Sequence, residues 1–220
     1  GTIYIPAGEY ACYSIRLANQ IHLYLEQGAT VVAAFPTAEQ GYDKAEPNPH
    51  NSFQDFGHSH WKNSLIWGIN LQDITISGPG KIDGKGLTRE ESRRDGVGNK
   101  VISLKECKNV TLKDLSMFRC GHFALLATGV DNLTLDNLKV DTNRDGFDID
   151  CCKNVRISRC SVNTPWDDAI VLKSSYADTI VEPCSAVLGN WMSLRRRTMA
   201  TVQDVSNWVQ NLAEDSRTLQ

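Results

Sequence analysis

The sequence predicts an all-β fold, a parallel β-helix (β-solenoid) in which short strands stack coil upon coil. A segment centred on an asparagine recurs at Asn109, Asn132 and Asn154, so the repeat is 23 and then 22 residues long. A repeat of this length, with alternating Val, Ile, Leu and Thr, is typical of a solenoid whose coils share one core. Apolar residues within each copy recur at every second position, which is the period of a strand and not of a helix.

Alignment of the copies places apolar residues in ladders. The first ladder holds Ile74, Val110, Leu133 and Val155, and the second holds Ile76, Leu112, Leu135 and Ile157. The third holds Leu115, Leu138 and Cys160, and the fourth holds Met117, Val140 and Val162. We expect these side chains to form the core, and residues 123–127, 147–151 and 169–173 to form a further strand of each copy.

The cysteines and asparagines of the repeat have structural interpretations. Cys107 and Cys152 occupy one repeat position with Val130 between them, which predicts a small apolar ladder. Two sheet spacings separate these cysteines, too far for a disulfide, and the chain has no CxxC pair that would indicate zinc. We expect the repeat asparagines to stack and to hydrogen-bond to one another along the coils.

We expect one β-helix domain over residues 1–177. Residues 178–220 lack the repeat and are expected to form a tail, either a capping helix, because apolar residues there recur at helical steps, or an irregular or disordered segment. Polar segments at 41–60 and 84–97 are expected to leave the stack as loops. The chain opens at Gly1 in a strand-like alternation without a start Met, which indicates a fragment truncated at its N-terminus.

Composition argues against two classes of partner. The net charge is −3 and 22% of residues are charged, whereas a nucleic-acid-binding protein usually has a basic surplus. No apolar run reaches the roughly 18 residues that a membrane-spanning helix needs, so no membrane partner is expected. We expect a monomer.

Three aspartates are predicted to meet on one face of the solenoid. Counting 13 residues on from each repeat asparagine gives His122, Asp145 and Asp167, and Asp168 follows directly. Stacked residues lie about 4.8 Å apart, so these carboxylates would repel each other and the pKa of one would rise. Such crowding costs stability, which favours a functional site. The alternative is that they are turn residues, because Asp and Asn are common in turns.

Residues around this column are candidates for substrate binding. Trp166 precedes the acid pair, where an aromatic face can stack on a sugar ring. Arg144 and Lys173 are candidates for contacting an anionic substrate. His122 is a candidate for hydrogen-bonding a carboxylate or a sugar.

Two further groups have competing interpretations. Asp148 and Asp150 alternate with apolar residues and should point outward, where they form either a calcium site or a solvated face. His58 and His60 lie in the polar segment 41–60, where a metal-binding role is not favoured. No metal ligand is assigned.

The chain resembles the polygalacturonase family of glycoside hydrolases in three motifs. These are the turn Asn143-Arg144-Asp145-Gly146, the pair Asp167-Asp168 one coil later, and the early segment Gly78-Pro79-Gly80-Lys81-Ile82-Asp83-Gly84. Arg144 replaces the threonine of the family's Asn-Thr-Asp-Gly turn. The resemblance covers roughly residues 1–177 and implies a right-handed parallel β-helix.

The resemblance also implies roles and a reaction. Asp167 would be the general acid that protonates the glycosidic oxygen, while Asp145 and Asp168 would hold and activate the attacking water. Family members invert the anomeric centre, which needs carboxyl groups about 6.5–9.5 Å apart. The substrate would be an α-linked galacturonic-acid-containing polysaccharide (pectin), and the protein would be secreted or periplasmic. No cofactor is expected, because carboxylic groups suffice for acid–base catalysis.

Two departures from the family keep alternatives open. The family's Gly-His-Gly turn and Arg-x-Lys segment normally follow the Asp pair, and nothing after Ala177 matches either. One alternative is therefore a non-catalytic carbohydrate-binding β-helix. Another is a β-helical polysaccharide (pectate) lyase that uses calcium. The outward acids Asp148 and Asp150 support this alternative.

Overall fold

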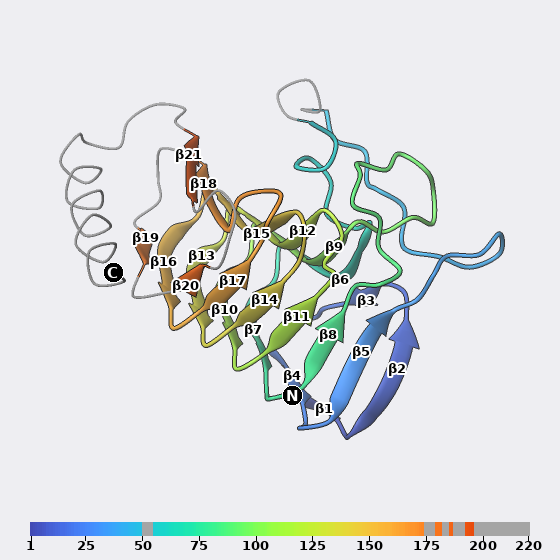
Figure 1. Ribbon diagram of the computed structural model, residues 1–220, viewed down its shortest axis with the longest axis horizontal. Coiled ribbons are helices and arrows are strands. Elements are labelled where there is room, and N and C mark those ends of the chain that lie inside the picture. Colours follow the sequence, from blue (N-terminus) through green and yellow to red (C-terminus); the bar gives the residue numbers. More distant parts are fainter. Residues whose placement is uncertain (50–54, 174–178, 182–184, 187–191, 196–220) are drawn as a thin grey trace.

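The computed structural model describes residues 1–49, 55–173, 179–181, 185–186 and 192–195 (Figure 1). Every regular element in these ranges is a strand, and the strands form three parallel seven-stranded sheets. The coil is right-handed, as parallel crossovers within one sheet almost always are. The predicted fold class is therefore confirmed. Within the same ranges, no helix is long and apolar enough to span a bilayer.

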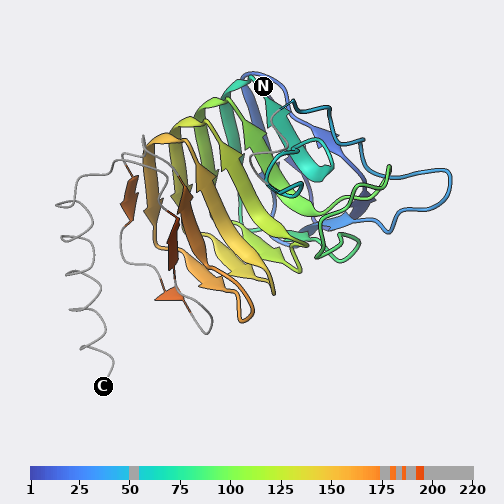
Figure 2. The same ribbon diagram turned by 90° about the horizontal axis from the view of Figure 1, so that it is seen from above.

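Each coil contributes one strand to each sheet, and Figure 2 shows the coils following one another along the long axis. The first sheet contains β1 (Thr2–Ile5), β4 (Ile21–Leu25), β7 (Gln72–Ser77), β10 (Lys108–Lys113), β13 (Asp131–Asp136), β16 (Lys153–Ser158) and β19 (Thr179–Val181). The second contains β2 (Gly8–Cys12), β5 (Ala29–Ala33), β8 (Lys81–Asp83), β11 (Ser116–Phe118), β14 (Lys139–Asp141), β17 (Ser161–Asn163) and β20 (Ser185–Ala186). The third contains β3 (Ile15–Arg16), β6 (Ser64–Ile69), β9 (Lys100–Lys105), β12 (Phe123–Thr128), β15 (Asp145–Asp150), β18 (Ile170–Lys173) and β21 (Met192–Arg195).

The core lies inside the coil, where the apolar ladders were predicted. Val110 pairs with Leu133 and Leu133 pairs with Val155, as the repeat requires. All members of the four predicted ladders are buried in one continuous apolar cluster. The ladder of Cys107, Val130 and Cys152 is also fully buried, and both of its cysteines are free thiols.

The repeat asparagines form the expected hydrogen-bonded ladder at one corner of the coil. The side-chain amide of Asn132 donates to Oδ1 of Asn109, and that of Asn154 donates to Oδ1 of Asn132, both at 2.9 Å. All three asparagines have positive φ angles between 51° and 59°. Asn tolerates this left-handed conformation better than most residues, so the ladder satisfies both the backbone and the side chains.

The sheets continue past Ala177, where the sequence pattern had predicted the end of the repeat. Strand β19 pairs with β16, β20 with β17 and β21 with β18. Parallel pairing uses backbone hydrogen bonds alone, so a further coil can form without the asparagine-centred signature. The expected capping helix or irregular tail lies otherwise outside the described residues.

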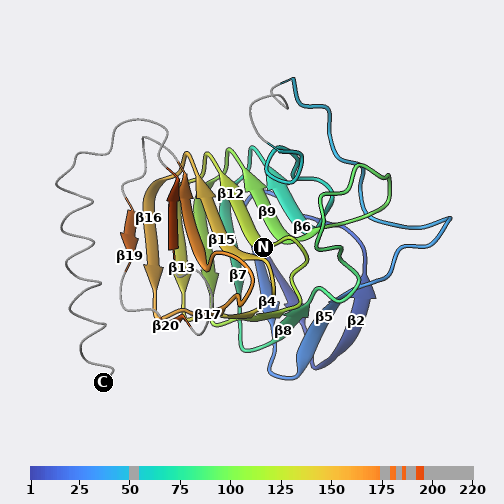
Figure 3. The ribbon, with the colours of Figure 1, turned by 45° about the horizontal axis from the view of Figure 1, so that its top comes forward.

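Two loops leave the stack beside its third sheet, as expected. A bridge between Tyr42 and Gly96 joins the first loop to the second. Trp61 packs on Phe123 and Leu126 of β12 in a small apolar cluster that is separate from the core. The segment 55–61, which we call the covering loop, therefore lies over the outer face of the third sheet (Figure 3).

Candidate active site

The three predicted aspartates meet where the second sheet turns into the third. Asp145 is the first residue of β15, while Asp167 and Asp168 lie in the turn that precedes β18. The backbone N–H of Gly146 donates to the carbonyl oxygen of Asp168 at 2.9 Å, which ties the two coils together. One carboxylate oxygen from each of the three aspartates lies within 4.8 Å of the others. The structure therefore brings together the acids that the repeat predicted.

The predicted register within this cluster was wrong by one residue. Asp145 pairs with Phe123 on one side, and the pairing of Phe147 with Ile170 places Asp145 level with Asp168 on the other. His122 and Asp167 therefore lie one position outside the column that was assigned to them. The turn before Asp145 is one residue shorter than its neighbours, so a fixed count from the repeat asparagine does not identify equivalent positions.

The nearest oxygen atoms of the three carboxyl groups lie close together. One oxygen of each acid lies within 4.8 Å of the others, whereas the roughly 6.5–9.5 Å expected for inversion is the separation of whole carboxyl groups. Two acceptors that share one water are at most about 5.6 Å apart, so a water can bridge any pair of these carboxylates. The acids are thus arranged around a single small volume.

Burial and crowding give Asp145 a distinct electrostatic character. Only 6% of Asp145 is exposed, and burial together with the charges of Asp167 and Asp148 raises its pKa to about 7. The guanidinium of Arg144 lies 3.0 Å from Oδ2 of Asp167. A carboxyl group with a pKa near 7 is only partly ionised at neutral pH, so Asp145 can carry a proton there.

The predicted binding residues have different environments. Trp166 is 79% exposed next to the acid pair, so its ring is available to a ligand. His122 is buried; its Nδ1 contacts the carbonyl oxygen of Arg89 at 2.8 Å, and burial lowers its pKa to about 4. His122 contacts the covering loop, because Gly57 packs closely against its ring.

The two predicted basic residues are already paired with acids. The ammonium group of Lys173 lies 2.9 Å from Asp148, and the guanidinium of Arg144 contacts Asp167.

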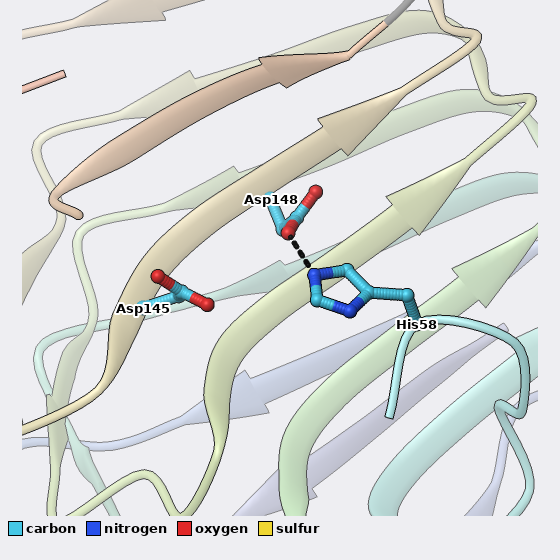
Figure 4. Close-up of side chains that lie close together, drawn as sticks. All are labelled: His58, Asp145 and Asp148. Atoms are coloured by element: carbon cyan, nitrogen blue, oxygen red, sulfur yellow. Dashed lines mark hydrogen bonds and ion pairs between the residues drawn. The ribbon is translucent and has the colours of Figure 1, made fainter. Parts of the chain in front are cut away.

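Sequence reasoning missed a second charged group beside the acids. His58 contacts Oδ2 of Asp148 at 3.0 Å through Nε2 (Figure 4). Its Nδ1 contacts Asp55. With Lys173, these residues form a line of alternating charges, Asp55–His58–Asp148–Lys173, which we call the buried charge chain after its buried member Asp148; Asp55 is its exposed end. Nothing in the repeat links a histidine in a polar loop to an aspartate 90 residues later. The only sequence signal was the outward position of Asp148.

A solvated face was one of the two alternatives for Asp148 and Asp150, and it was wrong. Asp148 is 0% exposed and Asp150 is 5% exposed, and His58 of the covering loop contacts Asp148. His58, Asp145 and Asp148 offer donor atoms within 4.8 Å of one another, a set that suits a metal ion in composition. The ammonium of Lys173 already lies 2.9 Å from Asp148, however, so positive charge is present there without a metal.

Comparison with known proteins identifies the family. The family model for glycosyl hydrolases family 28 matches residues 48–214. A polygalacturonase from Juniperus ashei is 25% identical over 170 residues, which are 66% of this chain and 33% of that protein. A probable polygalacturonase from Vitis vinifera is 24% identical over 79% of this chain and 37% of its own length. The chain thus spans about a third of the length of these curated relatives.

Solved structures share the fold. A polygalacturonase from Erwinia carotovora has a TM-score of 0.62 and 19% identity, with 84% of this chain and 55% of that chain covered. A family 28 exopolygalacturonase from Yersinia enterocolitica has a TM-score of 0.65 and 17% identity, with coverage of 84% and 43%. At this level of identity the likeness concerns the β-helix alone.

Proposed function

Because the chain belongs to glycosyl hydrolases family 28, we propose that it carries the acid–base centre of an enzyme that hydrolyses α-linked galacturonic-acid-containing polysaccharide (pectin). The observation that carries the proposal is the cluster of Asp145, Asp167 and Asp168, whose carboxylate oxygens lie within 4.8 Å of one another. A fold under selection for stability alone would separate such charges. The curated relatives named as polygalacturonases support the choice of substrate.

The proposed roles use the proton that the cluster holds. Asp167 is the general acid that protonates the glycosidic oxygen as the bond to the sugar breaks. Asp145 and Asp168 hold the water that attacks the anomeric carbon, and they accept its proton. One carboxylate oxygen of Asp145 lies within 4.8 Å of one of Asp167, so the proton that burial keeps on Asp145 can pass to Asp167 through a bridging water before the reaction. This transfer leaves a protonated acid beside an ionised base.

The surroundings of the acids suit an anionic sugar chain. The exposed ring of Trp166 offers a stacking surface one residue before Asp167. A hollow of about 560 Å³ is lined by three basic side chains and two acidic ones, those of Lys81, Arg89, Arg119, Asp83 and Asp141. Arg119 is paired with Asp83, which leaves Lys81 and Arg89 as the basic groups for an anionic sugar. Arg144 follows Asn143, which lines this hollow, and contacts Asp167, so we propose that its guanidinium orients a substrate carboxylate beside the acids. We propose that Lys173 does not bind the substrate directly, because its ammonium group is paired with Asp148.

We also propose the wider setting of the reaction. The acid–base mechanism requires no cofactor, because every proton transfer is carried by a carboxyl group or by water. A pectic polymer is met outside the cell, so the protein acts as a secreted or periplasmic monomer. We further propose that the three-sheet stack is the functional domain.

A product assay with polygalacturonate tests this proposal against its two rivals. We expect new reducing ends, no increase in ultraviolet absorbance and no effect of a chelator. A lyase would instead produce unsaturated ends that absorb in the ultraviolet and would lose activity with the chelator. Binding of pectic fragments without any cleavage would identify a non-catalytic β-helix. Either of these outcomes contradicts the proposed hydrolysis.

A further inference from the structure

The buried charge chain lies beside the acid cluster, and two of its members, Asp55 and His58, have no part in the roles proposed above. His58, Asp145 and Asp148 each place one polar atom within 4.8 Å of the other two (Figure 4). Asp145 and Asp148 come from β15, whereas His58 comes from the covering loop. A residue far away in the sequence is therefore held against the acid that carries the proton.

The position of His58 is fixed by contacts on several sides. Its Nδ1 contacts Asp55, its Nε2 contacts Asp148, and its ring packs edge-on against Phe123 with centroids 4.7 Å apart. Trp61 anchors the same loop in the apolar cluster on β12. A charge held in this way acts on Asp145 at a constant distance, unlike that of a flexible surface side chain.

Asp148 needs a cationic partner at this position. It is fully buried, and its neighbours in the sheet are the apolar residues Leu126 and Val171. Its Oδ2 contacts both His58 and Lys173, while its Oδ1 has no hydrogen-bond partner. An isolated carboxylate in such surroundings is unfavourable, so Asp148 in turn favours a charged His58.

We propose that His58 is a positioning residue, which holds a positive charge against Asp145 and thereby keeps this carboxyl available as the base that activates water. This inference rests on the proposed function, because it assigns His58 a part in the same hydrolysis. His58 acts through Asp145 and does not itself contact the sugar.

The charges around both groups agree with this role. Asp145 faces the like charges of Asp148, Asp167 and Asp168, with Arg144 and His58 as the opposing cations. Burial and the like charges raise the pKa of Asp145 to about 7, and the charge of His58 acts in the opposite direction.

His58 itself faces Asp55 and Asp148, with the cationic Lys173 and the ring of His122 nearby. Burial alone would lower the pKa of His58, but the hydrogen bonds to Asp148 and Asp55 outweigh it and raise this pKa to about 9. His58 therefore stays charged throughout the range in which Asp145 titrates.

The test is the substitution His58→Gln, which retains a side chain able to hydrogen-bond and removes the charge. We expect the pKa of Asp145, followed by carbon-13 NMR of its carboxyl group and assigned with Asp145→Asn, to rise by about one unit. Below that pKa, kcat/KM should fall about tenfold, because the ionised fraction of Asp145 falls by that factor. KM should change little.

Two further variants separate charge from structure. Asp55→Asn leaves the His58–Asp148 contact in place and weakens the positive charge, so it should shift the pKa of Asp145 in the same direction by a smaller amount. His22→Gln is the matched control, because His22 contacts Ser77 on the first sheet at 2.7 Å, away from the acids. It should leave both the pKa of Asp145 and the pH profile unchanged.

The NMR titration requires no turnover, so the two proposals can fail separately. Hydrolysis by the wild-type chain with an unshifted Asp145 in His58→Gln would overturn the role of His58 alone. A shifted Asp145 in a chain without hydrolytic activity would overturn the proposed function, and with it any part of His58 in catalysis.

Discussion

Two corners of the same coil differ in regularity and in chemistry. At the corner before the first sheet, Asn109, Asn132 and Asn154 repeat one conformation and one hydrogen bond in each coil. At the corner before the third sheet, the turns differ in length, and charged side chains replace the uniform ladder. The regular corner satisfies its polar groups within the stack. The irregular corner leaves carboxylates crowded, and their mutual repulsion lowers the stability of the fold where the reactive groups lie.

The largest effect that separates the two corners should come from Asp167→Asn. The amide keeps the shape of the side chain but cannot act as the general acid, so hydrolysis should fall about 10²–10⁴-fold. Reducing-end release from polygalacturonate measures this loss, and circular dichroism checks the fold. The matched control is Asp114→Asn in the turn between the first and second sheets, where Asp114 accepts a hydrogen bond from Asn137 away from the acids, so activity should persist. Full activity of Asp167→Asn would refute its role.

A second contrast concerns stability and pH. The folded-state pKa of Asp145 is about 7, above the unfolded value of about 3.9, so the folded state binds the proton more tightly. The contribution of Asp145 to stability therefore declines as pH rises from about 4 to 7. Asp145→Asn should stabilise the fold at pH 8 by on the order of 2 kcal/mol and should lose that advantage near pH 4.

Thermal or urea unfolding of Asp145→Asn at both pH values measures this difference. The same variant should be inactive, because it lacks the base. Equal stability of variant and wild type at pH 8 would mean that folding does not raise the pKa of Asp145.

The smallest effect is expected at the regular corner. Asn132→Ala removes two side-chain hydrogen bonds and places alanine at a φ of 59°, so it should cost about 1–2 kcal/mol of stability and leave activity intact. Asn132→Gly relieves the backbone strain and should recover about half of that loss. Urea midpoints of the two variants measure both contributions. Loss of activity in a folded Asn132→Ala would contradict the separation of the two corners.

The sequence predicted the regular parts of the molecule well, for a physical reason. Strand alternation and a constant repeat determine which residues face inward, so the apolar ladders, Cys107 with Cys152, and the asparagine ladder were confirmed. The meeting of Asp145, Asp167 and Asp168 was also predicted, because a coil of nearly constant length brings equivalent positions together. The exact register failed where one turn is a residue shorter.

The contacts of the buried charge chain could not be predicted from the sequence. Alternation correctly placed Asp148 on the outer face, but only the folded loop shows that this face is covered. The contact between His58 and Asp148 depends on the path of a loop that has no periodicity of its own. The three strands after Ala177 were missed because backbone pairing continues there without the side-chain signature.

The central claim is that neighbouring coils bring Asp145 and Asp167 so close that the two carboxyl groups share one proton at neutral pH. A pH titration of their carboxyl carbon-13 resonances in the wild-type chain measures this directly. We expect two separated steps, with the later one near pH 7 and sensed by both carboxyl groups. Independent titration of both groups near pH 4, the ordinary value for aspartate, would contradict it.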